Sequence, residues 1–297
     1  MITSEFKLKL EEVFKDKIEK IEALTNNVTL LIFSKRKILL KKVNPKCKNT
    51  YNFLSSQNVN NVLFPIKQIV FNNEIFFAFS YQINLDYPEE KKIINLIELM
   101  DEVHKKTGFT VRLNDINFKY FYRSYKTLDR IFQTLEMMVR ECEANPNKGD
   151  YDWIILSKYH IFLDCKKIMY QTQRKIHKYL DNHGSAMYAL NHGNLTLIHM
   201  INGKLISFDN AYIGIFVSDY AKLYVSLDDI KGEYFKDFIK KLDSYENDFY
   251  KLYFKFLVLY IYMINLRLSS YSSVVILNTY MQIASKVNRF LNLTSSF

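Results

Sequence analysis

The sequence predicts an α+β fold in two parts, a mainly antiparallel sheet over residues 1–83 and a mainly helical region over residues 84–297. The first part contains short apolar runs separated by turn residues, a pattern typical of strands and hairpins. In the second part, apolar residues recur at helical spacing over long stretches. Only seven glycines and four prolines occur among the 297 residues, so regular elements fill most of the chain. A chain of this length can build two lobes.

The predicted elements of the first part are an N-terminal helix and about five strands, with one helix inserted among them. Residues 4–20 carry apolar side chains at helical spacing, which predicts an amphipathic helix. Strands are predicted over residues 18–24, 28–33, 38–43, 64–71 and 75–82, and a short helix over residues 50–62. Turn residues at Asn26-Asn27 and Asn72-Asn73 separate two of the strand pairs.

The predicted elements of the second part are six helices and one hairpin. The helices span residues 91–106, 116–142, 151–180, 227–245, 249–268 and 272–291. Two apolar runs, Leu195–Ile201 and Lys204–Phe208, flank the turn dipeptide Asn202-Gly203 and predict the hairpin.

Composition indicates a folded protein without a membrane span. The hydrophobic content is 48%, well above that of disordered chains. The most apolar run, Phe256–Ile264, is too short to cross a bilayer, and no signal peptide is visible. The three cysteines are an odd number and form no CxxC motif, which favours a reducing compartment. We therefore expect a cytoplasmic protein.

Polar residues surround the predicted hairpin and indicate a buried site. His192-Gly193-Asn194 precede it, Asp209 follows it, and Asp219-Tyr220-Ala221 lie ten residues further on. Residues 188–224 resemble the catalytic segment of the protein-kinase-like small-molecule phosphotransferases, the family of aminoglycoside phosphotransferases, choline kinases and kinase-like spore-coat proteins. The family pattern is His-Gly-Asp, four residues, Asn, and an Ile-Asp-aromatic step after a hairpin.

The resemblance implies a two-lobed kinase-like fold with ATP and Mg²⁺ as ligands. It implies that Asp209 is the metal-binding aspartate, and that His192, Gly193 and Asp219 are structural residues of the catalytic loop. The phosphate-holding lysine lies on the third strand of this family, and Lys41 in Ile38–Val43 matches it, with Lys42 on the opposite face. A solvated strand lysine is an equally good interpretation of Lys41.

Two positions depart from the family pattern. Asn194 stands at the position of the catalytic base, and an amide is no base near neutral pH; general base catalysis contributes about 10²–10⁴-fold. His199 stands at the position of a metal-ligating asparagine, and imidazole suits zinc or copper better than magnesium. A structural role for His199, outward-facing or bonded to a backbone carbonyl, is the simpler interpretation.

The surroundings of Lys41 also depart from the pattern. No acidic residue occurs between Glu22 and Glu74, so the helix over residues 50–62 offers Lys41 no carboxylate. The first glycine of the chain is Gly108, so the first hairpin has no glycine-rich phosphate loop. Another His-Gly pair, His183-Gly184, lacks a following apolar hairpin and is discounted, and His160 and His177 are interpreted as ordinary helix residues.

The basic character of the chain gives a further hypothesis. The formal net charge is +10, and residues 24–73 contain eight basic residues and no acid. Such a run is usually a solvated surface. It could also bind nucleic acid, but no aromatic residues are interleaved with it in a stacking pattern, which argues against that function.

The sequence thus predicts a divergent, catalytically impaired kinase-like protein that acts by binding a nucleotide or a protein partner in an assembly. The alternatives are an active ATP-dependent kinase of a small hydroxyl or amine substrate, and a basic nucleic-acid-associated protein. The resemblance to spore-coat proteins adds a spore coat as an alternative location.

Overall fold

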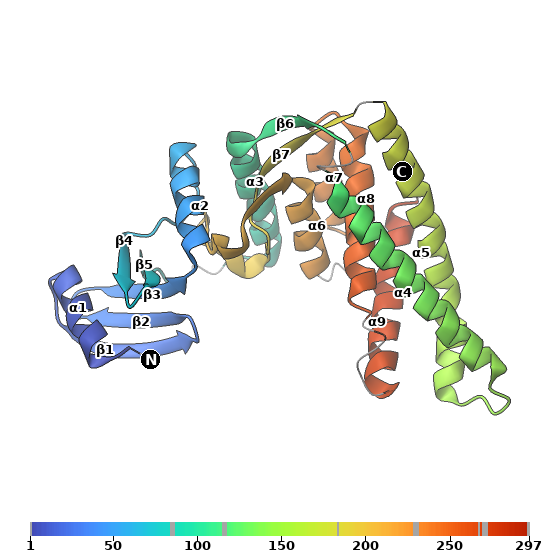
Figure 1. The fold of residues 1–297 in the computed structure, drawn as a ribbon, viewed down its shortest axis with the longest axis horizontal. Coiled ribbons are helices and arrows are strands. Elements are labelled where there is room, and N and C mark those ends of the chain that lie inside the picture. The colour runs from blue at the N-terminus through green and yellow to red at the C-terminus, as the bar shows by residue number, and fades with distance from the viewer. Residues whose placement is uncertain are drawn as a thin grey trace. The chain divides into compact units, whose positions relative to one another are not determined.

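The computed structural model describes residues 2–83, 87–114, 118–182, 184–227, 232–266, 268 and 273–295 (Figure 1). It divides into two compact units. Unit 1 contains residues 1–107 and 197–213, and unit 2 contains residues 108–196 and 214–297. The segment that carries Asp209 therefore belongs to the same unit as the N-terminal sheet. The predicted lobe boundary at residue 84 falls in 84–86, outside the described residues, and stays a prediction.

Unit 1 is built on a five-stranded antiparallel sheet, as the sequence predicts. The strand order is β1-β2-β3-β5-β4. The bounds are α1 Ser4–Phe14, β1 Ile18–Thr25, β2 Val28–Phe33, β3 Lys37–Val43, α2 Pro45–Ser56, β4 Lys67–Phe71, β5 Glu74–Ser80 and α3 Glu89–Thr107.

The two faces of β3 have different roles. Ile38 and Leu40 belong to a buried apolar cluster that also contains Phe6 and Leu10 of α1, so this face packs against the N-terminal helix. Successive side chains of a strand point to opposite faces. The alternate residues Leu39, Lys41 and Val43 therefore face away from α1.

Helix α2 begins earlier than predicted. It spans Pro45–Ser56, whereas the predicted helix spans residues 50–62. The Asn44 side chain accepts a hydrogen bond from the Cys47 N–H, and Pro45 occupies the first turn. Asparagine at the N-cap followed by proline is a strong helix start signal, and it sets the boundary here.

The hairpin of residues 197–213 is shorter than predicted. It consists of the 3₁₀ turn η1 Leu197–His199, the strands β8 Met200–Ile201 and β9 Lys204–Leu205, and the 3₁₀ turn η2 Phe208–Asn210. Asn202 and Gly203 have φ values of 49° and 73°, as a tight hairpin turn requires. Ser207 has φ 64° and ψ 54°, a left-handed conformation that cannot continue a strand. This residue ends the second predicted strand before Phe208.

Unit 2 is mainly helical, with a small three-stranded sheet in the order β10-β7-β6, of which the first two residues of β10 are counted in unit 1. The bounds are β6 Phe109–Arg112, α4 Lys119–Ala144, α5 Asp150–Asp181, β7 Ser185–Asn191, β10 Tyr212–Ile215, α6 Val217–Ser226, α7 Phe235–Asp243, α8 Asp248–Ile264 and α9 Ser273–Leu293. The three strands and α6, each of ten residues or fewer, were not predicted from the sequence. The predicted helix over residues 227–245 is confined to α7 among the described residues.

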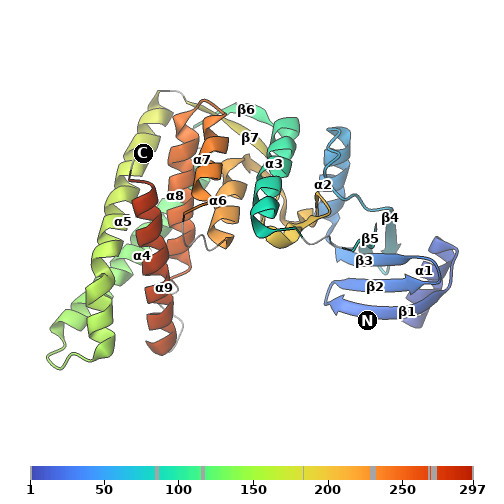
Figure 2. The ribbon, with the colours of Figure 1, turned by 180° about the vertical axis from the view of Figure 1, so that it is seen from behind.

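The helices α5, α8 and α9 lie side by side in unit 2 (Figure 2). Tyr220 and Tyr224 of α6 pack against rings of the neighbouring helices, including Phe238, Phe254 and Phe290. Among the helices that the structure describes, none has the length and apolar character needed to cross a membrane.

Candidate functional site

Lys41 of β3 contacts Asp209 of η2 directly. Its ammonium group forms an ion pair with Oδ2 of Asp209 and donates a hydrogen bond to Oγ of Ser207 at 3.1 Å. The Lys41 side chain is 19% exposed and that of Asp209 is 36% exposed. All three residues belong to unit 1, so one unit brings together the predicted phosphate-binding and metal-binding residues.

Cys47 of α2 makes a third contact with this centre. Its Sγ lies 3.3 Å from Oδ1 of Asp209 and donates to it. Burial of the thiol, and then the negative charge of Asp209, raise the pKa of Cys47 to about 12. The thiol therefore stays protonated at neutral pH and acts as a hydrogen-bond donor. Both carboxylate oxygens of Asp209 thus accept bonds from protein groups.

Tyr51, one turn further along α2, packs beside this centre. Its ring is 5% exposed and meets the ring of Phe208 edge-on, at a centroid distance of 6.3 Å. Burial raises the pKa of Tyr51, and the neighbouring Cys47 and Asp209 raise it further. Tyr51 therefore stays uncharged at neutral pH and forms part of the wall of the site.

A cavity of about 160 Å³ opens next to the Lys41–Asp209 ion pair. The residues Leu39, Lys41 and Val43 line it from the face of β3 that points away from α1. Its remaining walls are mostly apolar: Val28, Tyr51, Leu63, Phe79, Ile201 and Ile206, with Ser207 and Asp209 as the other polar residues. The site is therefore an apolar slot with one ion pair at its edge.

The neighbouring lysine lies on the other face of the strand. Lys42 forms an ion pair with Glu74 of β5, and both side chains are more than 40% exposed, at 47% and 44%. The structure thus separates the two lysines, and Lys41 is the one that lines the cavity.

The loop that follows β7 in unit 2 is held by Asp219 of α6. Its carboxylate is fully buried and accepts hydrogen bonds from the backbone N–H groups of His192, at 2.7 Å, and Gly193, at 3.0 Å. Gly193 has a φ of 84°, a conformation that glycine adopts without strain. Charge-assisted bonds of this kind contribute about 1.5–3 kcal/mol each.

Lys222 of α6, one turn after Asp219, also holds this loop and was not identified from the sequence. Its Nζ donates to the Gly193 carbonyl oxygen at 2.6 Å. Burial lowers the pKa of Lys222, and the charge of Asp219 opposes that effect. Asp219 thus accepts hydrogen bonds from the loop backbone, and Lys222 donates one to it. The i,i+3 spacing of these two residues on a helix was the signal in the sequence from which the pair could have been found.

Asn194 and His199, the two positions that depart from the family pattern, have different surroundings. Asn194 is exposed at the end of the His192 loop in unit 2, whereas His199 is 9% exposed in unit 1. The outward-facing interpretation of His199 is therefore wrong, because its side chain is buried. Among the described residues, no group of three or more His, Cys, Asp or Glu side chains could hold a metal ion. His183 lies outside the described residues.

These residues fit a nucleotide better than a metal ion. Apolar walls suit a planar base, and the Lys41 ammonium suits a phosphate. The cavity is smaller than the roughly 300–1,000 Å³ of typical ligand pockets, so it matches a base rather than a whole nucleotide. Magnesium prefers several oxygen ligands, and among the described residues Asp209 is the only carboxylate that lines this cavity.

Comparison with known proteins gives matches at the level of structure only. No protein-family model matches the chain, and no curated protein sequence matches it. Among solved structures, it resembles an aminoglycoside phosphotransferase from Alicyclobacillus acidocaldarius, with a TM-score of 0.67, 14% identity, and coverage of 93% of this chain and 91% of that chain.

Two further structures show the same likeness. A spectinomycin phosphotransferase in complex with ADP and spectinomycin has a TM-score of 0.54 and 9% identity, covering 95% of this chain and 98% of that one. The APH(2″)-IIa protein in its ternary complex with streptomycin and ATP has a TM-score of 0.50 and 12% identity, covering 97% of each chain. The sheet-and-helix architecture and these matches confirm the predicted fold class. The chain has the fold of the protein-kinase-like small-molecule phosphotransferases.

Proposed function

We propose that the protein binds an adenine nucleotide with its base in the cavity of unit 1 and transfers phosphoryl groups slowly or not at all. The observation that carries this proposal is the ion pair of Lys41 and Asp209 at the edge of an apolar slot. The complexes of two structural neighbours, with ADP and with ATP, support a nucleotide as the ligand.

The walls of the cavity suit such a ligand. The base would lie between the apolar side chains of β3 and the hairpin, such as Leu39 and Ile206. A phosphate would compete with Asp209 for the Lys41 ammonium, because both are oxygen anions. Lys41 is partly exposed, so it can change partner at small cost.

Three features support impaired transfer. Phosphoryl transfer depends on positioning and electrostatic stabilisation, including metal ions that bridge the phosphates. Asp209, the candidate metal ligand, is already neutralised by Lys41 and bonded to the Cys47 thiol. Asn194 offers an amide where the family has a base. Without an available metal ligand and without a catalytic base, nucleotide binding is the property that the protein retains.

Thermal unfolding with ATP, in the presence and absence of magnesium, tests this function. A ligand at 100 times its dissociation constant stabilises the folded protein by about 2.7 kcal/mol, which raises the midpoint by a few degrees. We expect such a rise with ATP alone and little further rise with magnesium. No shift at millimolar nucleotide contradicts nucleotide binding, and robust ATP-dependent turnover with a small hydroxyl or amine acceptor would establish the alternative of an active kinase.

A further inference from the structure

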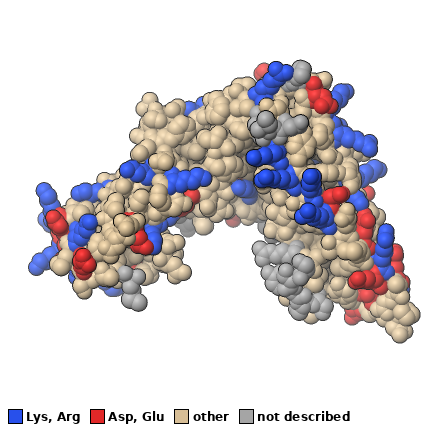
Figure 3. Space-filling view, viewed as in Figure 1, with Lys and Arg blue, Asp and Glu red and all other residues tan. Residues whose placement is uncertain are grey.

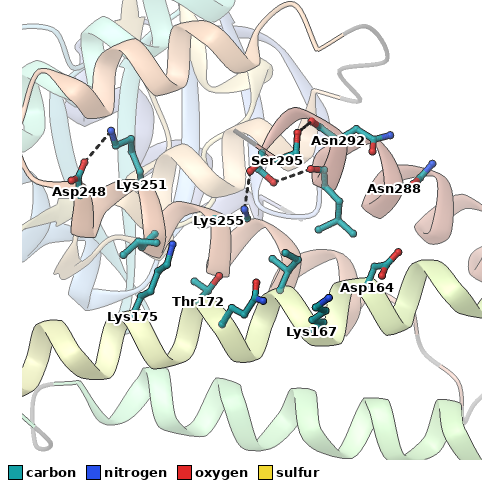
Figure 4. Close-up of a pocket in the computed structure, with 15 residues that line it drawn as sticks. Asp164, Lys167, Thr172, Lys175, Asp248, Lys251, Lys255, Asn288, Asn292 and Ser295 are labelled. Atoms are coloured by element: carbon teal, nitrogen blue, oxygen red, sulfur yellow. Dashed lines mark hydrogen bonds and ion pairs between the residues drawn. The ribbon is translucent and has the colours of Figure 1, made fainter. Parts of the chain in front are cut away.

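Unit 2 contains a second, larger cavity between α5, α8 and α9 (Figure 4). Its volume is about 830 Å³, within the range of roughly 300–1,000 Å³ that holds small-molecule ligands. None of its lining residues lines the cavity of unit 1. The charged residues at its wall are Asp164, Lys167 and Lys175 of α5, and Asp248, Lys251 and Lys255 of α8.

Lys255 is buried in this cavity, and no described residue supplies it with a counter-charge. It is 8% exposed, and its Nζ donates to the Thr294 carbonyl oxygen at 2.9 Å. Within the part of the chain that the structure describes, Lys255 forms no ion pair. Burial lowers the pKa of Lys255, and the charge of Lys175 lowers it further. A buried ammonium that uses one of its three donors is costly unless something else satisfies it.

The other lysines of the cavity leave a surplus of positive charge. Lys251 is neutralised, since its Nζ lies 2.8 Å from Oδ1 of Asp243 and 3.0 Å from Oδ1 of Asp248. Lys167 and Lys175 are exposed on α5, and neither forms an ion pair among the described residues. Asp164 is the remaining carboxylate at the wall. Counting the described residues alone, three lysines without carboxylate partners therefore share this cavity with one aspartate that forms no ion pair.

A purely structural role explains only part of this arrangement. Lys255 bonds a carbonyl just after the end of α9, which is a favourable place for a cation. That role requires one lysine at a helix end and does not require Lys167 and Lys175 on the facing helix. Figure 3 shows Lys and Arg over both units with Asp and Glu among them, so surface lysines alone carry no argument.

We propose that the cavity between α5, α8 and α9 binds the phosphate group of a small ligand, with Lys255 and Lys175 as its main contacts. A phosphate oxygen can take the remaining donors of the buried ammonium and supply the counter-charge that no described residue gives it. The polar side chains Thr172, Asn288 and Asn292 at the same wall suit the hydroxyl groups of a phosphorylated metabolite. This inference is independent of nucleotide binding in unit 1.

Calorimetric titration at constant ionic strength tests the site with three probes: glucose 6-phosphate, inorganic phosphate and glucose. We expect glucose 6-phosphate to bind and glucose not to bind. Tighter binding of the ester than of inorganic phosphate identifies a phosphorylated metabolite as the ligand class, whereas equal affinities identify inorganic phosphate. Binding of neither phosphate probe overturns the proposal.

Variants connect the binding to the cavity. Lys255→Met keeps the aliphatic stem and removes the buried charge, and we expect loss of phosphate binding. Lys175→Gln changes an exposed residue, so it retains the fold, and we expect about tenfold weaker binding. The control Lys158→Gln removes the same charge from an exposed position of α5 outside the cavity.

Equal affinity in Lys175→Gln and Lys158→Gln would mean that the probe responds to net charge, and this would overturn the site. A single-stranded oligonucleotide is a further probe. Tighter binding of the oligonucleotide than of glucose 6-phosphate, with a steep loss on adding salt, would indicate a polyanion surface instead and would also overturn the proposal.

Discussion

Lys41 and Asp209 are 168 residues apart in the sequence and form an ion pair within one compact unit. The alternation of β3 directs Lys41 away from α1, and the left-handed Ser207 turns the chain so that Asp209 meets it. The thiol of Cys47 occupies the second oxygen of the same carboxylate. The polar groups of the site therefore bond to one another. This is consistent with a protein in which a ligand binds by replacing Asp209 as a partner of Lys41.

The cysteines are expected to be unreactive in the native protein. Burial is the main cause that raises the pKa values of Cys47, Cys142 and Cys165, to about 12, 11 and 12. At pH 8, on the order of one thiol in 10³–10⁴ is ionised at such pKa values. Iodoacetamide should label none of the three in native protein and all three in guanidinium chloride, as counted by mass spectrometry.

The rate at which native Cys47 is labelled should increase with pH. Because the thiolate is the reactive form, labelling of native Cys47 should increase about tenfold per pH unit up to its raised pKa. Rapid labelling of Cys47 at pH 8, at the rate of free glutathione, would show that the start of α2 is open and that the bond to Asp209 is not maintained.

Asp219→Asn is expected to destabilise unit 2. The buried carboxylate accepts bonds from two backbone N–H groups, and the amide can accept only one and places its own N–H against the other. We expect a loss of about 1.5–3 kcal/mol in the free energy of unfolding, measured by urea titration.

Asp181→Asn is the matched control for that substitution. Asp181 is exposed at the end of α5, so its substitution should change the free energy of unfolding by less than about 0.5 kcal/mol. Equal effects of the two substitutions would mean that Asp219 does not hold the loop.

Asn194→Asp is expected to increase phosphoryl transfer. It restores a carboxylate at the exposed position where the family has its base, and base catalysis contributes about 10²–10⁴-fold. ADP production with an acceptor hydroxyl should increase from a very low rate in Asn194→Asp and stay unchanged in the control Asn194→Ala. A high rate in the unmodified protein that Asn194→Ala abolishes would make Asn194 a working catalytic residue and contradict the account.

The stability difference between the unmodified protein and Lys255→Met should depend on pH. The folded-state pKa of Lys255 is lowered, so its charge destabilises the folded protein fully below that pKa, and the effect disappears as the pH increases to the unfolded value of about 10.4. The unmodified protein should therefore gain stability relative to the variant between pH 7 and pH 10.

Other titrating groups of that cavity, such as Lys175, Lys251 and Asp164, are present in both proteins and largely cancel in the comparison. Urea unfolding at the two pH values measures the difference. A difference that is constant or changes in the opposite direction would show that Lys255 is not desolvated in the folded protein.

Local patterns predicted the long and strongly periodic elements. The strand over residues 28–33 agrees with β2, and the helix over residues 151–180 agrees with α5 to within one residue at each end. The hairpin over residues 195–208 was predicted too long because backbone conformation at Ser207, and not hydropathy, ends it. Helix α2 was predicted to start at residue 50, whereas the start signal Asn44-Pro45 sets its observed start.

The site was predictable only in part for a related reason. Lys41 and Asp209 were identified from a motif, and the strand alternation separates Lys41 from Lys42. Cys47 was missed because the misplaced helix start removed it from α2. Lys255 was not identified because its burial depends on the packing of α9 against α8, which no local pattern in the sequence encodes.

Calorimetric titration of ATP into the unmodified protein, Lys41→Met and Lys42→Met tests directly whether the Lys41–Asp209 ion pair belongs to a nucleotide site. The two variants remove the same charge from adjacent residues on opposite faces of β3. We expect Lys42→Met to bind ATP as the unmodified protein does, and Lys41→Met to bind it at least about tenfold more weakly, because Lys41→Met loses a charge-assisted bond. Equal affinities in all three proteins would contradict a nucleotide site at the Lys41–Asp209 ion pair.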